Sequence, residues 1–196
     1  MTGGSAGRLV PAGLPKAVGI EAACPPVLLV AETMTRRRIG VISDTHGLLR
    51  PEAVRALRDS ESIIHAGDIG KPEVLDALQA LAPVKAVRGN MDREPWARGL
   101  PKTEAFAIDQ VAVYVLHDLR EMDLVPEDVG FNLVVSGHSH QPSIQERNGV
   151  LFVNPGSAGP KRFRLPVSIA LLHILGASVD AELVPLLPLP PMRSLR

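Results

Sequence analysis

The stretch RIGVISDTHG (residues 38–47) decides the fold, because it joins a short apolar run to a turn of polar residues. The run Arg38–Ser43 is too short for a typical helix and contains Ile-Gly-Val-Ile, which favours a buried β-strand. Asp44 and His46 follow the run directly. The stretch therefore predicts a strand that ends in side chains able to bind a ligand.

The same order of strand, loop and helix recurs downstream. Pro51 stands where the first residue of a helix is expected, and a second short apolar run follows at Ser62–His65. Pro72 then opens a second predicted helix, and Val84–Val87 forms a third predicted strand. The order β-α-β-α-β predicts a parallel sheet with right-handed crossovers.

The second half of the chain is predicted to be mostly β-structure. Thr103–Ile108 and Val111–Leu116 are separated by a turn of hairpin length. Five further short runs read as strands: Leu133–Ser136, Ser143–Gln145, Val150–Val153, Val167–Leu175 and Val179–Val184. We therefore expect an α/β fold in which a second sheet packs against the first and helices lie outside.

Polar side chains with metal-binding chemistry follow several of these predicted strands. Taken singly, Asp44 could cap a helix, Asn90 could occupy a turn and His117 could be a hydrogen-bonded strand-end histidine. Parallel sheets bind ligands beyond the carboxyl ends of their strands, so the shared setting favours one metal site. Its candidate ligands are Asp44, His46, Asp68, Asn90, His117, His138 and His140.

The length and the first residues of the chain predict its organisation. With 196 residues and 45% hydrophobic content, one sizeable core is expected, in a domain at residues 36–187. Residues 1–35, rich in Gly, Ala and Pro, are expected to be a disordered extension, and residues 188–196 a frayed tail. A signal peptide is the alternative for the first segment, although Glu21 interrupts its apolar part. Translation starting at Met34 is a further hypothesis.

The charge balance argues against some classes of partner. Lys plus Arg equal Asp plus Glu at 21 each, so no basic field would attract a long nucleic acid or an acidic membrane. Aromatic residues make up 3% of the chain, which leaves little for stacking on single-stranded nucleic acid. The single cysteine, Cys24, excludes an intramolecular disulfide and fits a reducing compartment, so the predicted location is cytoplasmic.

Five ordered motifs carry a family resemblance. They are Asp44-Thr45-His46-Gly47, Gly67-Asp68, Gly89-Asn90, His117 and Gly137-His138-Ser139-His140. On these motifs the chain resembles the calcineurin-like metallophosphoesterase superfamily, in particular its small prokaryotic YfcE-type phosphodiesterases, over about residues 38–184. The resemblance implies a four-layer α/β/β/α sandwich of two mixed sheets with flanking helices.

The resemblance also implies a site with two divalent metal ions. One ion would be held by Asp44, His46 and His140, the other by Asn90, His117 and His138, and Asp68 would bridge them. These seven residues would form the catalytic site. Imidazole and oxygen donors without thiolates suit Mn²⁺, Fe, Ni²⁺ or Zn²⁺, of which we favour Mn²⁺. The implied reaction is hydrolysis of a small or exposed phosphodiester by in-line attack of a metal-bridging hydroxide.

The chain departs from its relatives at two positions. Many relatives carry a histidine at the position of Met91, where it can protonate the leaving oxygen, and a glycine at the position of Asp118. The missing general acid would harm substrates with good leaving groups least. Asp118 adds bulk and negative charge beside the second metal, which would either tighten metal binding or repel a phosphate dianion, and a diester would be repelled less than a monoester. The basic cluster Lys161, Arg162 and Arg164 is a hypothetical phosphate contact.

Several alternatives remain open from the sequence. The fold also resembles a eukaryotic retromer subunit that serves as a protein-interaction scaffold with an incomplete metal site, and a nuclease or cyclic-nucleotide phosphodiesterase is a third alternative. Relatives are often homo-oligomeric. His65 and His173 lie inside apolar runs and are predicted to be core histidines, and Asp92 is either a partner of a ligating imidazole or a turn residue.

Overall fold

The computed structural model describes residues 1, 35–162 and 164–188. The extension predicted at residues 1–35 and the tail predicted at residues 188–196 lie outside the described residues, apart from one or two at their ends. Cys24, Met34 and the segment considered as a signal peptide also lie outside the described residues, so the predictions that rest on them stay predictions. The division into extension, domain and tail therefore stays a prediction.

The first sheet has the strand order β10-β9-β1-β2-β3. Its strands β1 (Arg37–Ile42), β2 (Ser62–His65) and β3 (Val84–Ala86) are parallel, as the β-α-β-α-β order predicts. β9 (Ser168–Leu175) pairs antiparallel with β1, and β10 (Ser178–Pro185) pairs antiparallel with β9. The sheet is therefore mixed, and β1 lies at its centre.

The second sheet has the strand order β4-β5-β6-β8-β7. β4 (Thr103–Ile108) and β5 (Val111–Leu116) form the predicted hairpin. β6 (Leu133–Val135) runs parallel to β5 and to β8 (Val150–Asn154), and β7 (Ser143–Arg147) pairs antiparallel with β8. Because β5 and β6 are parallel, they end at the same edge of this sheet.

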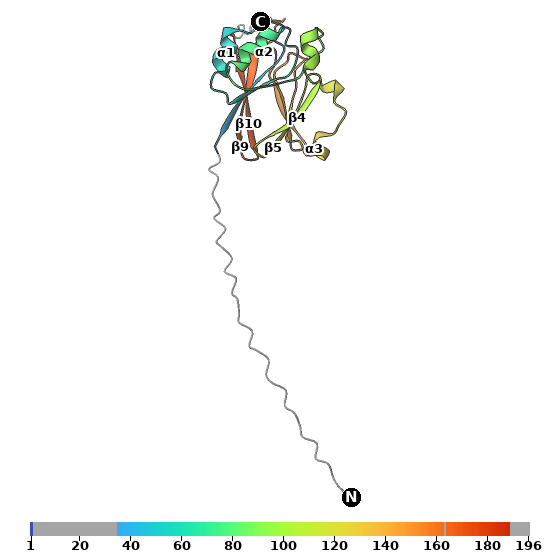
Figure 1. Ribbon diagram of the computed structural model, residues 1–196. Helices are drawn as coiled ribbons and strands as arrows, with labels where there is room; N and C mark the ends of the chain where they lie inside the picture. The colour runs from blue at the N-terminus through green and yellow to red at the C-terminus, as the bar shows by residue number, and fades with distance from the viewer. Residues whose placement is uncertain (2–34, 163, 189–196) are drawn as a thin grey trace, which may run out of the picture. The chain divides into compact units, whose positions relative to one another are not determined.

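The two sheets pack face to face, as Figure 1 shows with β9 and β10 on one side and β4 and β5 on the other. Every second residue of a strand points to the same face, so Val41 of β1, Val113 of β5 and Leu172 of β9 meet in one core between the sheets. All three are 0% exposed. The predicted sheet-on-sheet packing is confirmed.

Helices cover the outer face of the first sheet. α1 (Pro51–Leu57) and α2 (Pro72–Gln79) begin at the predicted prolines, whose missing N–H groups cost nothing in the first turn of a helix. Both pack their buried residues on the sheet. At Gly40 of β1, a Cβ would collide with the Leu57 side chain, so glycine lets α1 approach closely.

The outer layer on the second sheet is thinner. Tyr114 and Leu116 of β5 pack under a segment that contains only the 3₁₀ helix η2 (Leu119–Glu121) and the short helix α3 (Pro126–Val129). One further 3₁₀ helix, η1 (Pro95–Gly99), joins the two sheets. The architecture is thus two mixed five-stranded sheets with helices on both outer sides, the α/β/β/α sandwich that the resemblance implies.

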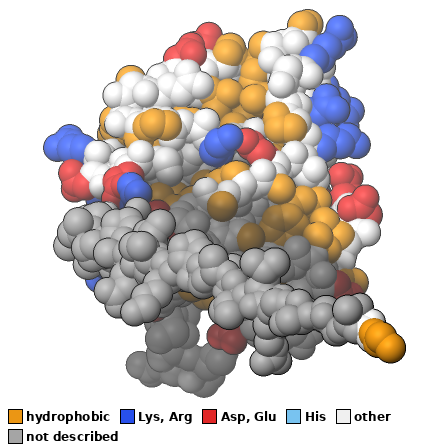
Figure 2. All heavy atoms as spheres, turned by 60° about the horizontal axis from the view of Figure 1, so that its bottom comes forward, with side chains coloured by type: hydrophobic (Ala, Val, Ile, Leu, Met, Phe, Trp, Pro, Cys, Tyr) orange, Lys and Arg blue, Asp and Glu red, His pale blue; other side chains and the backbone are white. Residues whose placement is uncertain are grey.

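The surface carries side chains of both charges, as the equal numbers of acidic and basic residues predict. Figure 2 shows a face on which Lys, Arg, Asp and Glu side chains occur close to one another, among hydrophobic and uncharged groups. In the described part of the chain, no helix combines the length and the hydropathy that a bilayer crossing requires.

The two histidines predicted for the core differ. His65 is 0% exposed, and Thr45 Oγ1 lies 3.0 Å from its Nε2. Since this hydroxyl donates its hydrogen to the Ile69 carbonyl, it accepts from Nε2–H. Nδ1 is left buried, with no hydrogen-bond partner in the part of the chain that the structure describes. His173 was predicted as a packed or hydrogen-bonded core histidine. Its Nε2 is hydrogen-bonded to Glu182 at 3.3 Å, but its ring is partly exposed and does not lie in the core.

The buried His65 ring predicts a loss of stability in mild acid. Burial lowers the pKa of His65 from 6.5 to about 4, because protonation would place a charged N–H where it has no acceptor. The unfolded chain therefore binds one more proton between these pH values. Stability should fall as pH drops through this window, by up to about 3 kcal/mol.

Urea unfolding in EDTA, measured across this window, tests the prediction. His65→Gln keeps an N–H for Thr45 but does not titrate, so its free energy of unfolding should change with pH by about 3 kcal/mol less than that of the parent chain. His173→Gln, at the partly exposed ring, is the control. An equal pH dependence in all three proteins would contradict the explanation.

Candidate metal centre

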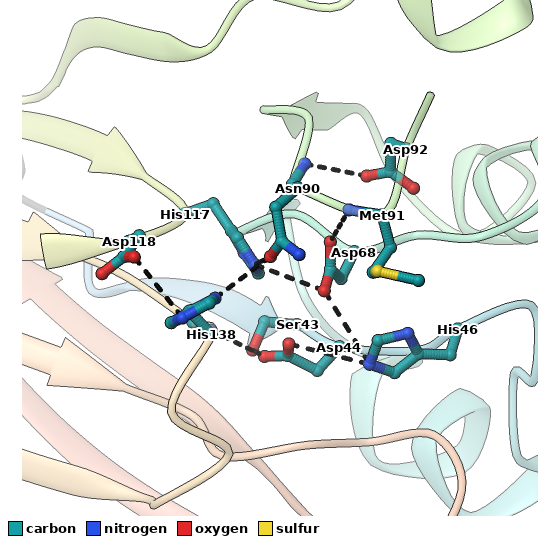
Figure 3. Close-up of polar contacts among 12 residues, drawn as sticks. Ser43, Asp44, His46, Asp68, Asn90, Met91, Asp92, His117, Asp118 and His138 are labelled. Atoms are coloured by element: carbon teal, nitrogen blue, oxygen red, sulfur yellow. Dashed lines mark hydrogen bonds and ion pairs between the residues drawn. The ribbon is translucent and has the colours of Figure 1, made fainter. Parts of the chain in front are cut away.

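Loops from both sheets meet where their strands end (Figure 3). These are the loops after β1, β2 and β3 in the first sheet and after β5 and β6 in the second. They carry the seven predicted ligands, in chain order Asp44, His46, Asp68, Asn90, His117, His138 and His140. The side chains predicted to share a site are thus brought together from positions up to 96 residues apart, between Asp44 and His140.

Five of the seven residues adopt the left-handed backbone conformation. Their φ angles are 54° for Asp44, 46° for His46, 54° for Asp68, 65° for His138 and 58° for His140. This region is unfavourable for residues with a Cβ atom, at about 1–3 kcal/mol each, and such strain gathers at functional sites. The turns therefore aim these side chains inward at a cost in local stability.

Asp44 is the most buried member of the centre, with a side chain that is 0% exposed. Its Oδ2 accepts from Ser43 Oγ at 2.7 Å and from the His138 backbone N–H at 3.1 Å. Its Oδ1 lies 3.1 Å from Nε2 of His140, yet the geometry is not that of a hydrogen bond and this buried oxygen has no hydrogen-bond partner among the described residues.

Asp44, His46 and His140 form one compact group, whose ligand atoms all lie within 4.8 Å of one another. The Nε2 atoms of His46 and His140 are 3.5 Å apart, and Nε2 of His46 is 3.9 Å from Oδ1 of Asp44. A buried carboxylate oxygen without a donor is costly unless a cation satisfies it. This donor set therefore fits a metal ion.

Asp68 lies between His46 and His117 (Figure 3). Its Oδ2 is 3.9 Å from Nε2 of His46 and 3.4 Å from Nε2 of His117, while its Oδ1 accepts from the Met91 backbone N–H at 2.8 Å. Burial alone would raise the pKa of Asp68, but the hydrogen bond and charge of His117 outweigh it, so the pKa is lowered and the group is an anion.

His117 presents its Nε2 to the centre. Its Nδ1 lies 2.7 Å from the Ala66 carbonyl, which can only accept, so Nδ1 carries a hydrogen. The other ring nitrogen of His117, Nε2, is then without a hydrogen and lies 3.2 Å from Oδ1 of Asn90. Both atoms present lone pairs, so this contact is favourable only with a proton or a cation between them. Burial lowers the pKa of His117, but Asp68 raises it more, so the site favours positive charge here.

The remaining predicted ligands complete the second cluster. Nδ1 of His138 lies 3.1 Å from Oδ1 of Asn90, on the side of that amide also approached by His117. Asp44, Asp68 and His117 form a further group with ligand atoms within 4.8 Å. Which side chain binds which ion stays a prediction.

Asp92 has a role that the sequence analysis missed. It neither contacts a ligating imidazole nor merely forms a turn, since its carboxylate accepts from the backbone N–H groups of Ile69, Gly70 and Gly89 at 3.1, 2.8 and 2.8 Å. Asp92 thereby joins the loop after β2 to the loop after β3. Its position two residues after Asn90 of the Gly-Asn motif was the signal in the sequence.

Asn154 was also missed as a site residue. Its Nδ2 donates to the Gly137 carbonyl at 2.7 Å and to Ser139 Oγ at 3.1 Å, which anchors the loop carrying His138 and His140. The sequence signal was its place at the start of Asn154-Pro155-Gly156-Ser157, a stretch rich in turn-forming residues that precedes the basic cluster of Lys161, Arg162 and Arg164.

Two arginines flank the centre from opposite clusters. Nη2 of Arg162 lies 3.4 Å from Nε2 of His46, and Arg162 is exposed, as are its neighbours Lys161 and Arg164. Nη2 of Arg120 lies 2.7 Å from Nε2 of His138. The sequence analysis did not single out Arg120, because its neighbourhood to His138 arises only when the loops after β5 and β6 meet.

Cavities open beside both clusters. One of about 600 Å³ is lined by residues that include Asn90, His117 and Lys102. Another, of about 200 Å³, is lined by residues that include His138, His140 and Arg162. The donor atoms are therefore accessible to a ligand from two sides, although most of the side chains that carry them are buried.

Comparisons with known proteins agree with this geometry. Residues 38–176 match the calcineurin-like phosphoesterase superfamily domain. The chain is 40% identical over 158 residues to a protein of Methanothermobacter thermautotrophicus named "Probable metallophosphoesterase". The match covers 74% of this chain and 91% of that protein.

Solved structures share the fold. One, described as a novel archaeal phosphodiesterase, superposes with a TM-score of 0.63 at 23% identity. The superposition covers 75% of this chain and 99% of that protein's chain. Another, Vps29 of Entamoeba histolytica complexed with Zn²⁺, gives a TM-score of 0.62 at 23% identity, covering 76% and 99%. On the sequence match and the shared fold, this chain belongs to the calcineurin-like phosphoesterase superfamily.

Proposed function

We propose that this protein is a phosphodiesterase that hydrolyses a small or exposed phosphodiester with two divalent metal ions, Mn²⁺ being the first choice. The observation that carries the proposal is the buried Oδ1 of Asp44, which has no hydrogen-bond donor among the described residues and lies against the imidazoles of His46 and His140. Such an oxygen calls for a cation, and binding of divalent metal ions is typical of the family.

The residues of the centre would divide the work. Asp44, His46 and His140 would hold one ion, Asn90, His117 and His138 the other, and Asp68 would contact both. Bound in this way, two divalent ions supply a water of lowered pKa and stabilise the charge that develops on the phosphoryl oxygens. The seven ligands orient and hold the ions, and the hydrogen bonds of Ser43 and Asn154 keep the ligand loops in place.

Arg162 would bind the phosphate. Its guanidinium lies beside His46 at the mouth of the smaller cavity, and it is exposed, so it can turn toward a ligand. A guanidinium presents parallel N–H donors to two phosphate oxygens. The positive charge of Arg162 would offset the negative charge of the substrate locally. The protein as a whole cannot do so, because its net charge is zero.

Two features favour a diester over a monoester. Met91 occupies the position of a leaving-group acid, its side chain is exposed, and only its backbone N–H contacts Asp68. Asp118 places a carboxylate 3.4 Å from His138, where the dianion of a monoester would be repelled more than the monoanion of a diester. A relative in Methanocaldococcus jannaschii, 26% identical over 137 residues, is named a phosphodiesterase.

The alternative of an interaction scaffold is less well supported, because all seven candidate donor residues are present in the sequence. A long nucleic-acid substrate is disfavoured by the net charge of zero. A cytoplasmic location and a homo-oligomeric state stay predictions from the sequence.

Substrate choice and metal dependence test the proposal. Purified protein loaded with Mn²⁺ should hydrolyse bis-p-nitrophenyl phosphate faster than p-nitrophenyl phosphate, and EDTA should abolish turnover. Asn90→Ala and His117→Ala should each lower turnover by at least about 10²-fold, because each removes a ligand of one ion. Inactivity of the parent chain with both ions bound, shown by metal analysis, would favour the scaffold instead.

Replacement of Arg162 tests its role in phosphate binding. Arg162→Ala should lower kcat/KM for the diester by about 10- to 100-fold through loss of charge stabilisation, while metal stoichiometry stays the same. Lys161→Ala removes the same charge from the adjacent exposed residue and should have little effect. Equal losses in the two variants would mean that Arg162 acts only through the general field of the loop.

A further inference from the structure

The His138 ring is contacted on two opposite edges (Figure 3). Its Nδ1 faces Oδ1 of Asn90 at 3.1 Å. On the opposite edge, Nε2 lies 3.4 Å from Oδ2 of Asp118 and 2.7 Å from Nη2 of Arg120.

We propose that Asp118 is a positioning residue that orients His138 as a metal ligand through its Nδ1. The inference rests on the proposed function, since it takes His138 as a ligand of the ion that Asn90 and His117 also bind. Asp118 itself contacts no ion in this scheme and acts only through the ring.

The single N–H of a neutral imidazole supplies the chemical reason. A ligating nitrogen must be bare, so coordination through Nδ1 places the hydrogen on Nε2, which then requires an acceptor. Arg120 has only donors and cannot accept this hydrogen. The 2.7 Å contact of its Nη2 with Nε2 is a hydrogen bond donated to a bare Nε2, so this contact must open before Nε2 can carry the hydrogen. Among the described residues, Asp118 is the carboxylate found within 4 Å of Nε2, and it therefore stabilises the tautomer that can bind a metal.

Exposure explains why His138 needs this support. Its side chain is 31% exposed, against 6% for His117 and 11% for His140. His117 is fixed by packing and by its bond to the Ala66 carbonyl. Less packing surrounds His138, so a side-chain partner must set the angle of its ring.

Arg120 in turn fixes Asp118. The Arg120 Nε lies 3.1 Å from both carboxylate oxygens, its Nη2 lies 2.7 Å from Oδ2, and its backbone N–H donates to Oδ1 at 3.0 Å. The Asp118 side chain is 15% exposed and that of Arg120 is 77% exposed, so the arginine holds the carboxylate from the solvent side. These bonds persist when Arg120 gives up its contact with Nε2 of His138.

Zinc binding tests the inference without a measurement of activity. Protein stripped with a chelator is titrated with Zn²⁺ by calorimetry, and the parent chain should bind two equivalents. Asp118→Ala should weaken the affinity for one equivalent by about 10- to 100-fold and leave the other unchanged. Asp118→Asn retains an oxygen acceptor and should restore part of the loss. In the parent chain, ¹⁵N chemical shifts of the Zn²⁺-loaded His138 ring should report the Nε2–H tautomer.

Two further variants separate the possible failures. Asp123→Ala removes the same charge from an exposed acidic residue of the same segment and should bind both equivalents as the parent does. His138→Ala should lose the equivalent that Asp118→Ala weakens. Thermal unfolding of each variant checks that the fold is retained.

The inference is overturned if Asp118→Ala binds zinc like Asp123→Ala while His138→Ala loses one equivalent, and the proposed metal centre then stands. If His138→Ala itself retains both equivalents, His138 is not a ligand, and the assignment of the second ion fails together with the role of Asp118.

Discussion

The centre depends on the buried carboxylate of Asp44, which stands where the two sheets meet. The backbone N–H of Asp44 donates to the Gly67 carbonyl at 3.0 Å, and its carbonyl accepts from Ser157 Oγ at 3.0 Å and from the Gly159 N–H at 3.2 Å. With Oδ2 bonded to Ser43 and to the His138 N–H, every polar group of the residue except Oδ1 is satisfied by protein. These hydrogen bonds hold Asp44 in place and leave Oδ1 available to a ligand.

The strained turns around this carboxylate are tolerated because rigid elements hold them from both ends. Each left-handed residue lies close to the end of a strand whose apolar side chains are buried between the sheets. Asp92 joins two of the loops through three backbone N–H groups, and Asn154 anchors a third. The strain costs stability locally, and burial in two large apolar clusters offsets it.

The two halves of the centre differ in how they are supported. The cluster of Asp44, His46 and His140 lies deep, and its charge partner Arg162 comes from the loop before β9. The other cluster includes the partly exposed His138, beside which Asp118 and Arg120 form an ion pair. Hydrogen bonds from Arg120 lower the pKa of Asp118 to about 2, so the carboxylate is charged in neutral solution. The protein has no net charge, yet fixed charges of both signs surround one small site.

How much the sequence predicts depends on whether a feature is local. Short apolar runs bounded by turns predicted the strands of both sheets, and the prolines at helix starts predicted where α1 and α2 begin, because such patterns follow from the geometry of single elements. The ordered motifs carried the family and the seven candidate ligands. The sequence did not predict the roles of Asp92, Asn154 and Arg120, or the exposed setting of His173, since each follows from loops or strands that meet only in the folded chain. The sequence by itself thus determined which side chains end the strands, and the tertiary structure decided which of their atoms face one another, because two sheets must pack before loops far apart in the chain come into contact.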